Sequence, residues 1–227
     1  MFLKFRSELR SGKNRIFLFP YSLDLAKPDK SFFIRPEVTR IASELLGKLL
    51  ISDIGGTRTS GIIVETEAYS WREKGCHAFQ NKMTKRNSTM FREGGVAYVY
   101  LCYGIHSLLN VVTNTEGQAD AVLIRALEPV DGVMLMQQRT GAKTERRITS
   151  GPGKLTKALG IDTSYDGFDL LKSKSIIRIQ DAGLVVPKQK IVKTTRIGIE
   201  FAGEDSKLPW RFYLRENPWV SVKSLNT

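Results

Sequence analysis

The segment Gly61-Ile-Ile-Val-Glu-Thr-Glu-Ala-Tyr69 is the stretch of this sequence that decides the fold. It is rich in β-branched residues and is typical of a strand. Alternate residues of a strand point the same way, so the segment has an apolar face and a polar face. The apolar face carries Ile62, Val64 and Ala68, and the polar face carries Glu65, Glu67 and Tyr69.

Two glutamates, Glu65 and Glu67, lie on the polar face with one residue between them. This spacing corresponds to about 6.6–7 Å along a strand. It falls within the range of about 6.5–9.5 Å that separates the acid from the base in inverting glycosidases. Alternating glutamates are more often a solvated strand face, and the spacing alone favours that interpretation over a catalytic pair.

A helix is expected on the N-terminal side of this strand. Pro36 suits a first helical turn, and apolar residues then recur at helical spacing, which predicts an amphipathic helix of about 14 residues. The apolar positions are Val38, Ile41, Ala42, Leu45, Leu46 and Leu49. Gly55 and Gly56 mark the turn that leads from this helix to the strand.

On the C-terminal side, the chain alternates between β-rich runs and helical segments. The β-rich runs cover residues 94–103, 107–113, 121–127, 175–180, 191–201 and 210–214, and the helical segments cover residues 130–139 and 153–159. The first two runs are joined by a hairpin turn at residues 103–106. Strands in hairpin groups predict an α+β domain rather than a doubly wound sheet. We expect a mostly antiparallel, curved sheet with packed helices and a protruding β-hairpin.

Residues 1–30 carry scattered charges and little periodicity, and we expect them to form an N-terminal extension. Residues 31–227 contain no repeat and no linker, and we expect them to form a single domain. No apolar run approaches the ~18 residues that a membrane helix needs, so a soluble protein with no membrane partner is expected.

The net charge of +12 is the strongest feature of the composition. Like charges repel in the folded state, so this excess indicates a polyanionic partner such as nucleic acid. The basic residues concentrate in two stretches, residues 82–92 and 139–157. A merely solubilising surface is the alternative interpretation of this charge.

The two cysteines, Cys76 and Cys102, cannot form a disulfide framework, which indicates a reducing, cytoplasmic compartment. The only two histidines, His77 and His106, stand close to them in sequence. Neither pair has the spacing of a structural zinc site, so we expect no metal and no cofactor.

Three tyrosines, Tyr98, Tyr100 and Tyr103, lie in and after the first β-rich run. Such residues are more often core or hairpin-stabilising pairs. In a strongly basic protein they can instead stack on nucleic-acid bases, which is worth about 1–3 kcal/mol per base.

Several blocks of this sequence, in order, resemble the alkyladenine (3-methyladenine) DNA glycosylases. The blocks are Ile63-Val-Glu-Thr-Glu-Ala-Tyr69, Tyr98-Val-Tyr-Leu-Cys-Tyr-Gly104, Leu108-Leu-Asn-Val111, Leu123-Ile-Arg-Ala-Leu-Glu-Pro129, Ser150-Gly-Pro-Gly-Lys-Leu155, Arg196-Ile-Gly-Ile199, Arg211-Phe-Tyr213 and Asn217-Pro-Trp-Val-Ser221. They cover roughly residues 33–223. No single block is decisive, but the ordered set is specific.

The resemblance implies a hydrolysis with no covalent enzyme intermediate. Glu67 would be the general base that deprotonates the attacking water, and Arg125 would help to position that water. A carboxylate near the sugar would also stabilise the oxocarbenium-like state through which the base is lost. Glu65 would have a structural hydrogen-bonding role, and His106 would contact the DNA backbone or minor groove.

The resemblance also implies a pocket for a flipped purine. Tyr69, His77 and Tyr100 would form its walls, Asn110 would lie by the base edge and disfavour the amino group of guanine, and Tyr103 would enter the duplex where the base left. The connection from Tyr69 to His77 is one residue shorter than in the animal members, which leaves a loop histidine without a role as the alternative for His77.

We therefore expect a monomeric, monofunctional DNA glycosylase that acts on double-stranded DNA containing damaged purines. Its substrates would be alkylated or deaminated purines such as 3-methyladenine, 7-methylguanine and hypoxanthine, and its product an abasic site. Two alternatives differ in class. One is a non-enzymatic nucleic-acid binder, and the other is a carbohydrate glycosidase that uses Glu65 and Glu67, which the positive charge disfavours.

Overall fold

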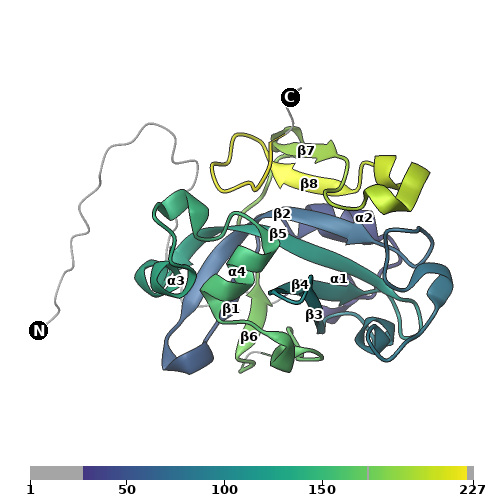
Figure 1. Cartoon of the computed structure of the whole chain (residues 1–227), viewed down its shortest axis with the longest axis horizontal. Coiled ribbons are helices and arrows are strands. Elements are labelled where there is room, and N and C mark those ends of the chain that lie inside the picture. Colours follow the sequence, from purple (N-terminus) through teal and green to yellow (C-terminus); the bar gives the residue numbers. More distant parts are fainter. Residues whose placement is uncertain (1–27, 173, 224–227) are drawn as a thin grey trace, which may run out of the picture.

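The sheet is built around one long strand, β2 (Thr59–Tyr69), in the computed structural model, which describes residues 28–172 and 174–223. One edge of β2 pairs with β5 (Asp120–Asp131) along its length. The other edge is shared, because the first half of β2 pairs with β1 (Leu49–Ser52) and its second half with β8 (Arg211–Leu214). Figure 1 shows β2 and β5 crossing the middle of the molecule, with β8 beside the end of β2.

The complete sheet has eight strands in the order β3-β4-β5-β2-β1-β6, with β7 and β8 joined to it through β2. The strands not yet defined are β3 (Ala97–Cys102), β4 (His106–Thr113), β6 (Ile177–Gln180) and β7 (Ile191–Thr194). Every strand pair is antiparallel, which confirms the α+β class and the single domain.

The helices are short and pack on the sheet. They are α1 (Lys30–Phe33), α2 (Val38–Glu44), α3 (Val133–Thr140) and α4 (Pro152–Leu159). Short 3₁₀ segments cover Ile54–Gly56, Phe79–Asn81, Ser88–Phe91, Glu145–Arg147, Thr163–Tyr165, Lys188–Lys190 and Glu200–Lys207. Within the described residues, no helix is long and apolar enough to cross a membrane.

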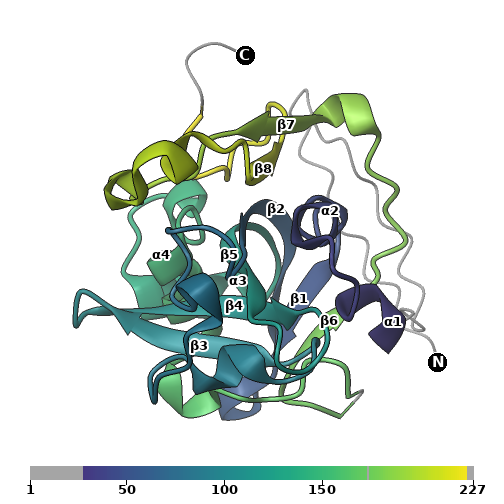
Figure 2. The same ribbon diagram turned by 90° about the vertical axis from the view of Figure 1, so that its right-hand side faces the viewer.

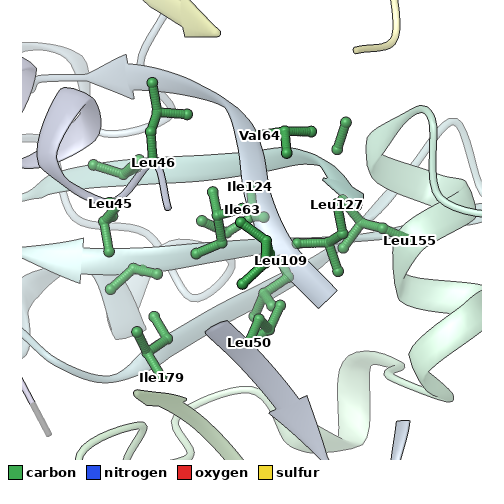
Figure 3. Packing of buried hydrophobic residues seen from close by; sticks show 14 of the residues in the cluster. Leu45, Leu46, Leu50, Ile63, Val64, Leu109, Ile124, Leu127, Leu155 and Ile179 are labelled. Carbon is green, nitrogen blue, oxygen red and sulfur yellow. The ribbon is translucent and has the colours of Figure 1, made fainter. Parts of the chain in front are cut away.

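The main core lies where α2 and α4 pack on β2 and its neighbours. Leu45 and Leu155 belong to this core on either side of the central strand residues Ile63, Val64 and Leu127 (Figure 3). A leucine buried in such a core contributes about 1.5–3 kcal/mol. A second buried cluster, which includes Met90, Phe91 and Tyr98, lies under the long connection between β2 and β3.

The β3–β4 hairpin projects from the body of the molecule, as Figure 2 shows. Cys102 pairs with His106, which leaves a three-residue turn of Tyr103, Gly104 and Ile105. Tyr103 and Gly104 both have positive φ, 50° and 70°. The predicted hairpin is therefore confirmed, with His106 in the returning strand rather than in the turn.

The expected 14-residue helix from Pro36 is wrong in length. α2 ends at Glu44, and Leu49 already belongs to β1. Gly47 adopts φ 86° and donates its N–H to the Ile63 carbonyl, so the chain turns into the sheet there. Apolar residues at 45, 46 and 49 continue the helical spacing because both the turn and the buried strand need apolar side chains.

Two further predictions are wrong in extent. α3 begins at Val133 because β5 continues to Asp131, and Gly132 with φ 69° separates the two. The β-rich run 191–201 is a strand only over β7, and a 3₁₀ helix begins at Glu200. The expected N-terminal extension falls, for residues 1–27, outside the described residues. Asp29 is the N-cap residue of α1, and its side chain accepts a hydrogen bond from the Ser31 N–H.

Candidate functional site

A pocket of about 450 Å³ lies between the β3–β4 hairpin, β5 and the segment around Ile197. Its lining includes most of the residues that the sequence singled out: Tyr69, His77, Tyr100, Tyr103, Asn110 and Arg125. The structure thus brings together side chains that are up to 56 positions apart in the chain (Tyr69 to Arg125).

Glu67 lies directly behind this pocket and is fully buried. Its Oε2 accepts hydrogen bonds from the Tyr69 hydroxyl at 2.9 Å and from Arg125 Nη1 at 3.2 Å. Its Oε1 accepts the Ile197 N–H at 2.8 Å. An ionised carboxylate offers about four acceptor positions, and these donors use three of them. One position of Glu67 is left for another donor.

Burial raises the pKa of the Glu67 carboxyl above its usual value. The charge of Arg125 and the hydrogen bonds from the Ile197 N–H and the Tyr69 hydroxyl act in the opposite direction, whereas the nearby Glu65 adds to the increase. A carboxylate with a raised pKa is a stronger base at neutral pH than an exposed one.

Arg125 connects the two glutamates of β2. Its Nε donates to Glu65 Oε1 at 3.1 Å while its Nη1 donates to Glu67. The register between β2 and β5 shifts on both sides of Glu65, so that Glu65 pairs with Ala126 and Thr66 with Ile124. Arg125 lies at this irregularity, and such a bulge re-aims a side chain.

Glu65 has a different environment from Glu67. It accepts hydrogen bonds from Arg125, from Arg211 Nε at 2.7 Å and from both the N–H and the hydroxyl of Ser221. Both glutamates are fully buried. The expectation of a solvated strand face is therefore wrong, because Arg125 from β5, Arg211 from β8 and Ser221 contact these carboxylates and bury them.

Aromatic side chains form one side of the pocket. The His77 and Tyr100 rings meet edge to face with centroids 4.5 Å apart, and Tyr98 stacks on Tyr100 at 5.4 Å. His77 Nδ1 lies 3.0 Å from the Tyr98 hydroxyl. Burial lowers the pKa of His77, and the nearby Arg86 lowers it further, so the imidazole is neutral at neutral pH.

Asn110 and Tyr103 both line the pocket, but Asn110 is buried and Tyr103 is exposed. Asn110 is buried on β4 and donates from Nδ2 to the Tyr98 carbonyl at 3.2 Å. Tyr103 is 87% exposed at the hairpin turn. A tyrosine in the left-handed region is uncommon, and its ring lies away from the core.

Sequence reasoning missed the segment that completes the site. Arg196 is buried and forms a bidentate ion pair with Glu73, through Nη1–Oε1 at 2.7 Å and Nη2–Oε2 at 2.8 Å. Its guanidinium lies 4.8 Å from the centre of the Tyr69 ring. The next residue, Ile197, supplies the backbone donor to Glu67. The block Arg196-Ile-Gly-Ile199 was visible, but a backbone N–H leaves no mark on side-chain patterns.

The two cysteines and the two histidines do not form a metal-binding group. Cys76 packs in the second cluster, and both cysteines are free thiols. Among the described residues, no three or more histidine, cysteine or acidic side chains are grouped so as to hold a metal ion.

Comparison with known proteins gives the class of this fold and site: hydrolases that act on the N-glycosidic bond of DNA. The family model of methylpurine-DNA glycosylase matches residues 31–218, and the chain belongs to this family. Its members are enzymes of base excision repair, and this protein is a DNA glycosylase.

The chain is similar to curated bacterial proteins that carry the provisional name 3-methyladenine DNA glycosylase. The relative from Carboxydothermus hydrogenoformans is 47% identical over 194 residues, which cover 86% of this chain and 98% of the relative. The relative from Natranaerobius thermophilus is 42% identical over 199 residues, with 86% and 99% covered. A third, from Chlamydia abortus, is 42% identical over 189 residues, with 82% and 96% covered.

Proposed function

We propose that this protein, acting as a monomer on double-stranded DNA, flips an alkylated or deaminated purine into the pocket and hydrolyses its N-glycosidic bond with a water that Glu67 activates. The product is an intact abasic site. Purines of the 3-methyladenine, 7-methylguanine and hypoxanthine type are the proposed substrates.

The observation that carries this proposal is the remaining acceptor position of Glu67. Three donors hold the carboxylate in place and one lone-pair position stays available for a water molecule. Burial raises the pKa of this carboxyl, which favours proton removal from water. Its negative charge, close to the pocket, would also stabilise the positive charge that develops on the sugar.

The pocket has the size and lining that a single base requires. Its volume of about 450 Å³ lies within the range of about 300–1,000 Å³ found for small-molecule sites. The rings of Tyr69, His77 and Tyr100 supply π-faces for stacking. Asn110 lies at the inner edge, where its amide would meet the exocyclic amino group of guanine and disfavour that base.

Extrusion requires something to fill the vacated stack. Tyr103 is proposed for this role because its exposed ring stands at the end of the projecting hairpin. A base cannot be attacked while it is stacked in the duplex, so this step must precede the chemistry.

The carbohydrate-glycosidase alternative loses its support in this geometry. An inverting pair needs two carboxyls that are available to the substrate and a water, but Glu65 already accepts four hydrogen bonds inside the protein. The non-enzymatic binder is disfavoured as well, because the chain belongs to a family of DNA glycosylases and has a buried carboxylate next to the pocket.

The direct test is incubation with a duplex that carries one alkylated purine. We expect release of the free base, detected by chromatography, and a strand that breaks only after alkaline treatment. Unmodified duplex is the matched control. The proposal fails if no base is released, or if the strand breaks without alkali.

A further inference from the structure

Arg86 stands at the mouth of the pocket and has no role in the chemistry described so far. It lies between the 3₁₀ segments Phe79–Asn81 and Ser88–Phe91, and its side chain is exposed while also lining the pocket. It belongs to the basic stretch of residues 82–92 that the sequence indicated.

The guanidinium of Arg86 is held in place by two contacts with β3. Its Nη2 donates to the Leu101 carbonyl at 3.4 Å. Its central carbon lies 5.6 Å from the centre of the Tyr100 ring, within the distance of a cation–π contact. A side chain held in this way loses less conformational entropy when it binds a ligand.

The positive charge of Arg86 is not neutralised by a carboxylate. No ion pair among residues 28–172 and 174–223 includes Arg86. The other arginine of the pocket, Arg125, is committed to Glu65 and Glu67. Arg86 also lies close enough to lower the pKa of His77, after the larger effect of burial. The mouth of the pocket therefore carries a positive charge that no carboxylate of the described residues neutralises.

We propose that Arg86 binds a phosphodiester group of the DNA strand, namely one of the two phosphates that flank the nucleotide whose base enters the pocket. This inference rests on the proposed function. A base in the pocket stays joined to its sugar, so its flanking phosphates must lie at the mouth. A planar guanidinium presents a fork of N–H donors that matches two phosphate oxygens.

The test measures binding rather than base release. The probe is a duplex with a single tetrahydrofuran abasic analogue, prepared with an ordinary phosphate or with an uncharged methylphosphonate at each flanking position. For the wild-type protein, we expect one of the two methylphosphonates to weaken binding about tenfold, the fold-change that corresponds to a hydrogen bond with a charged group. In Arg86→Ala, that methylphosphonate should cost nothing further.

Lys85→Ala is the matched control, because it removes one exposed charge from the adjacent position, which does not line the pocket. This variant should bind more weakly overall but keep the full methylphosphonate penalty. Equal penalties in wild type and Arg86→Ala at both positions would overturn the inference. The abasic analogue carries no base, so this binding test does not depend on excision. A failed excision assay would reject the proposed function but would leave the outcome for Arg86 to the binding test.

Discussion

Glu67 combines full burial with three hydrogen-bond donors, so its position is held by the protein before any substrate arrives. Glu67→Gln keeps the size of the side chain but removes the proposed general base. We expect excision to fall by about 10²–10⁴-fold, the usual contribution of general base catalysis. Binding to damaged duplex should be retained, because Glu67 lies behind the pocket rather than on its surface.

The measurement is single-turnover base release beside equilibrium binding on the same substrate. Release from Glu67→Gln at close to the wild-type rate would contradict the assignment of the base. Asp169→Asn is a suitable control, since its carboxylate pairs with Lys172 and does not line the pocket.

The acid limb of the pH–rate profile follows from the same environment. Burial raises the pKa of Glu67, and the base must be ionised to work. Excision should therefore decline, as pH falls, at a higher pH than an ordinary glutamate would give. The Tyr69 hydroxyl lowers the pKa of Glu67, so Tyr69→Phe should move this limb to still higher pH. Single-turnover rates across pH test this, and an unmoved or downward-shifted limb contradicts it.

The side chains of the site could be predicted from the sequence more fully than their environments. Glu65 and Glu67 look equivalent in the strand pattern. Arg211 and Ser221, which lie far along the chain, fill the acceptor positions of Glu65, whereas Glu67 keeps one acceptor position. The Ile197 N–H donor could not be predicted, because backbone direction depends on the fold.

The β3–β4 hairpin is held by α4 on one side. The Thr156 hydroxyl donates to the Ser107 carbonyl at 2.6 Å. A Cβ at Gly153 would come within 2.8 Å of the His106 ring, so the hairpin packs closely on the start of the helix. This contact supports the returning strand next to the turn while leaving Tyr103 exposed.

Tyr103→Ala should slow excision from duplex DNA without lowering the melting temperature, because the ring has the proposed role in extrusion and is exposed in the free protein. The effect should shrink when the damaged base is already unpaired, since unstacking costs a few kcal/mol per extruded base. Tyr103→Gly is the stricter variant. Glycine accepts φ 50° without strain, so stability should be equal or higher while the loss of excision remains.

Rates on paired and unpaired substrates, together with thermal melting, decide this point. Equal losses on both substrates with a lower melting temperature would instead mean that Tyr103 packs on its own hairpin.

The elements with a strict alternation, β2 and the hairpin, could be predicted closely. The elements that failed are those where glycine ends a pattern. Gly47, with positive φ, lies in the turn that follows α2, and Gly132, also with positive φ, precedes α3. The apolar periodicity of the sequence continues past both glycines. Periodicity reports which side chains are buried, and a turn between two buried elements is buried as well.

The charge of the whole molecule is distributed between structure and surface. Arg139 belongs to the second basic stretch but is half-buried and donates to the backbone carbonyls of Ala158 and Ile54. The exposed residues of the two stretches include Lys82, Lys85, Arg86, Arg92, Lys143, Arg146, Arg147, Lys154 and Lys157. These side chains are the ones available to phosphates.

Binding to duplex DNA should therefore depend steeply on salt. Each phosphate contact releases condensed counterions, so the logarithm of the binding constant should fall with the logarithm of salt concentration by about 0.9 per contact. If Arg86 makes one such contact, Arg86→Ala should reduce the steepness of this slope by about 0.9. Binding isotherms at several salt concentrations on undamaged duplex give the slope for the general contacts, and the same isotherms on the duplex with the abasic analogue give the change caused by Arg86→Ala. A binding constant that does not change with salt would mean that the net charge of +12 serves only solubility.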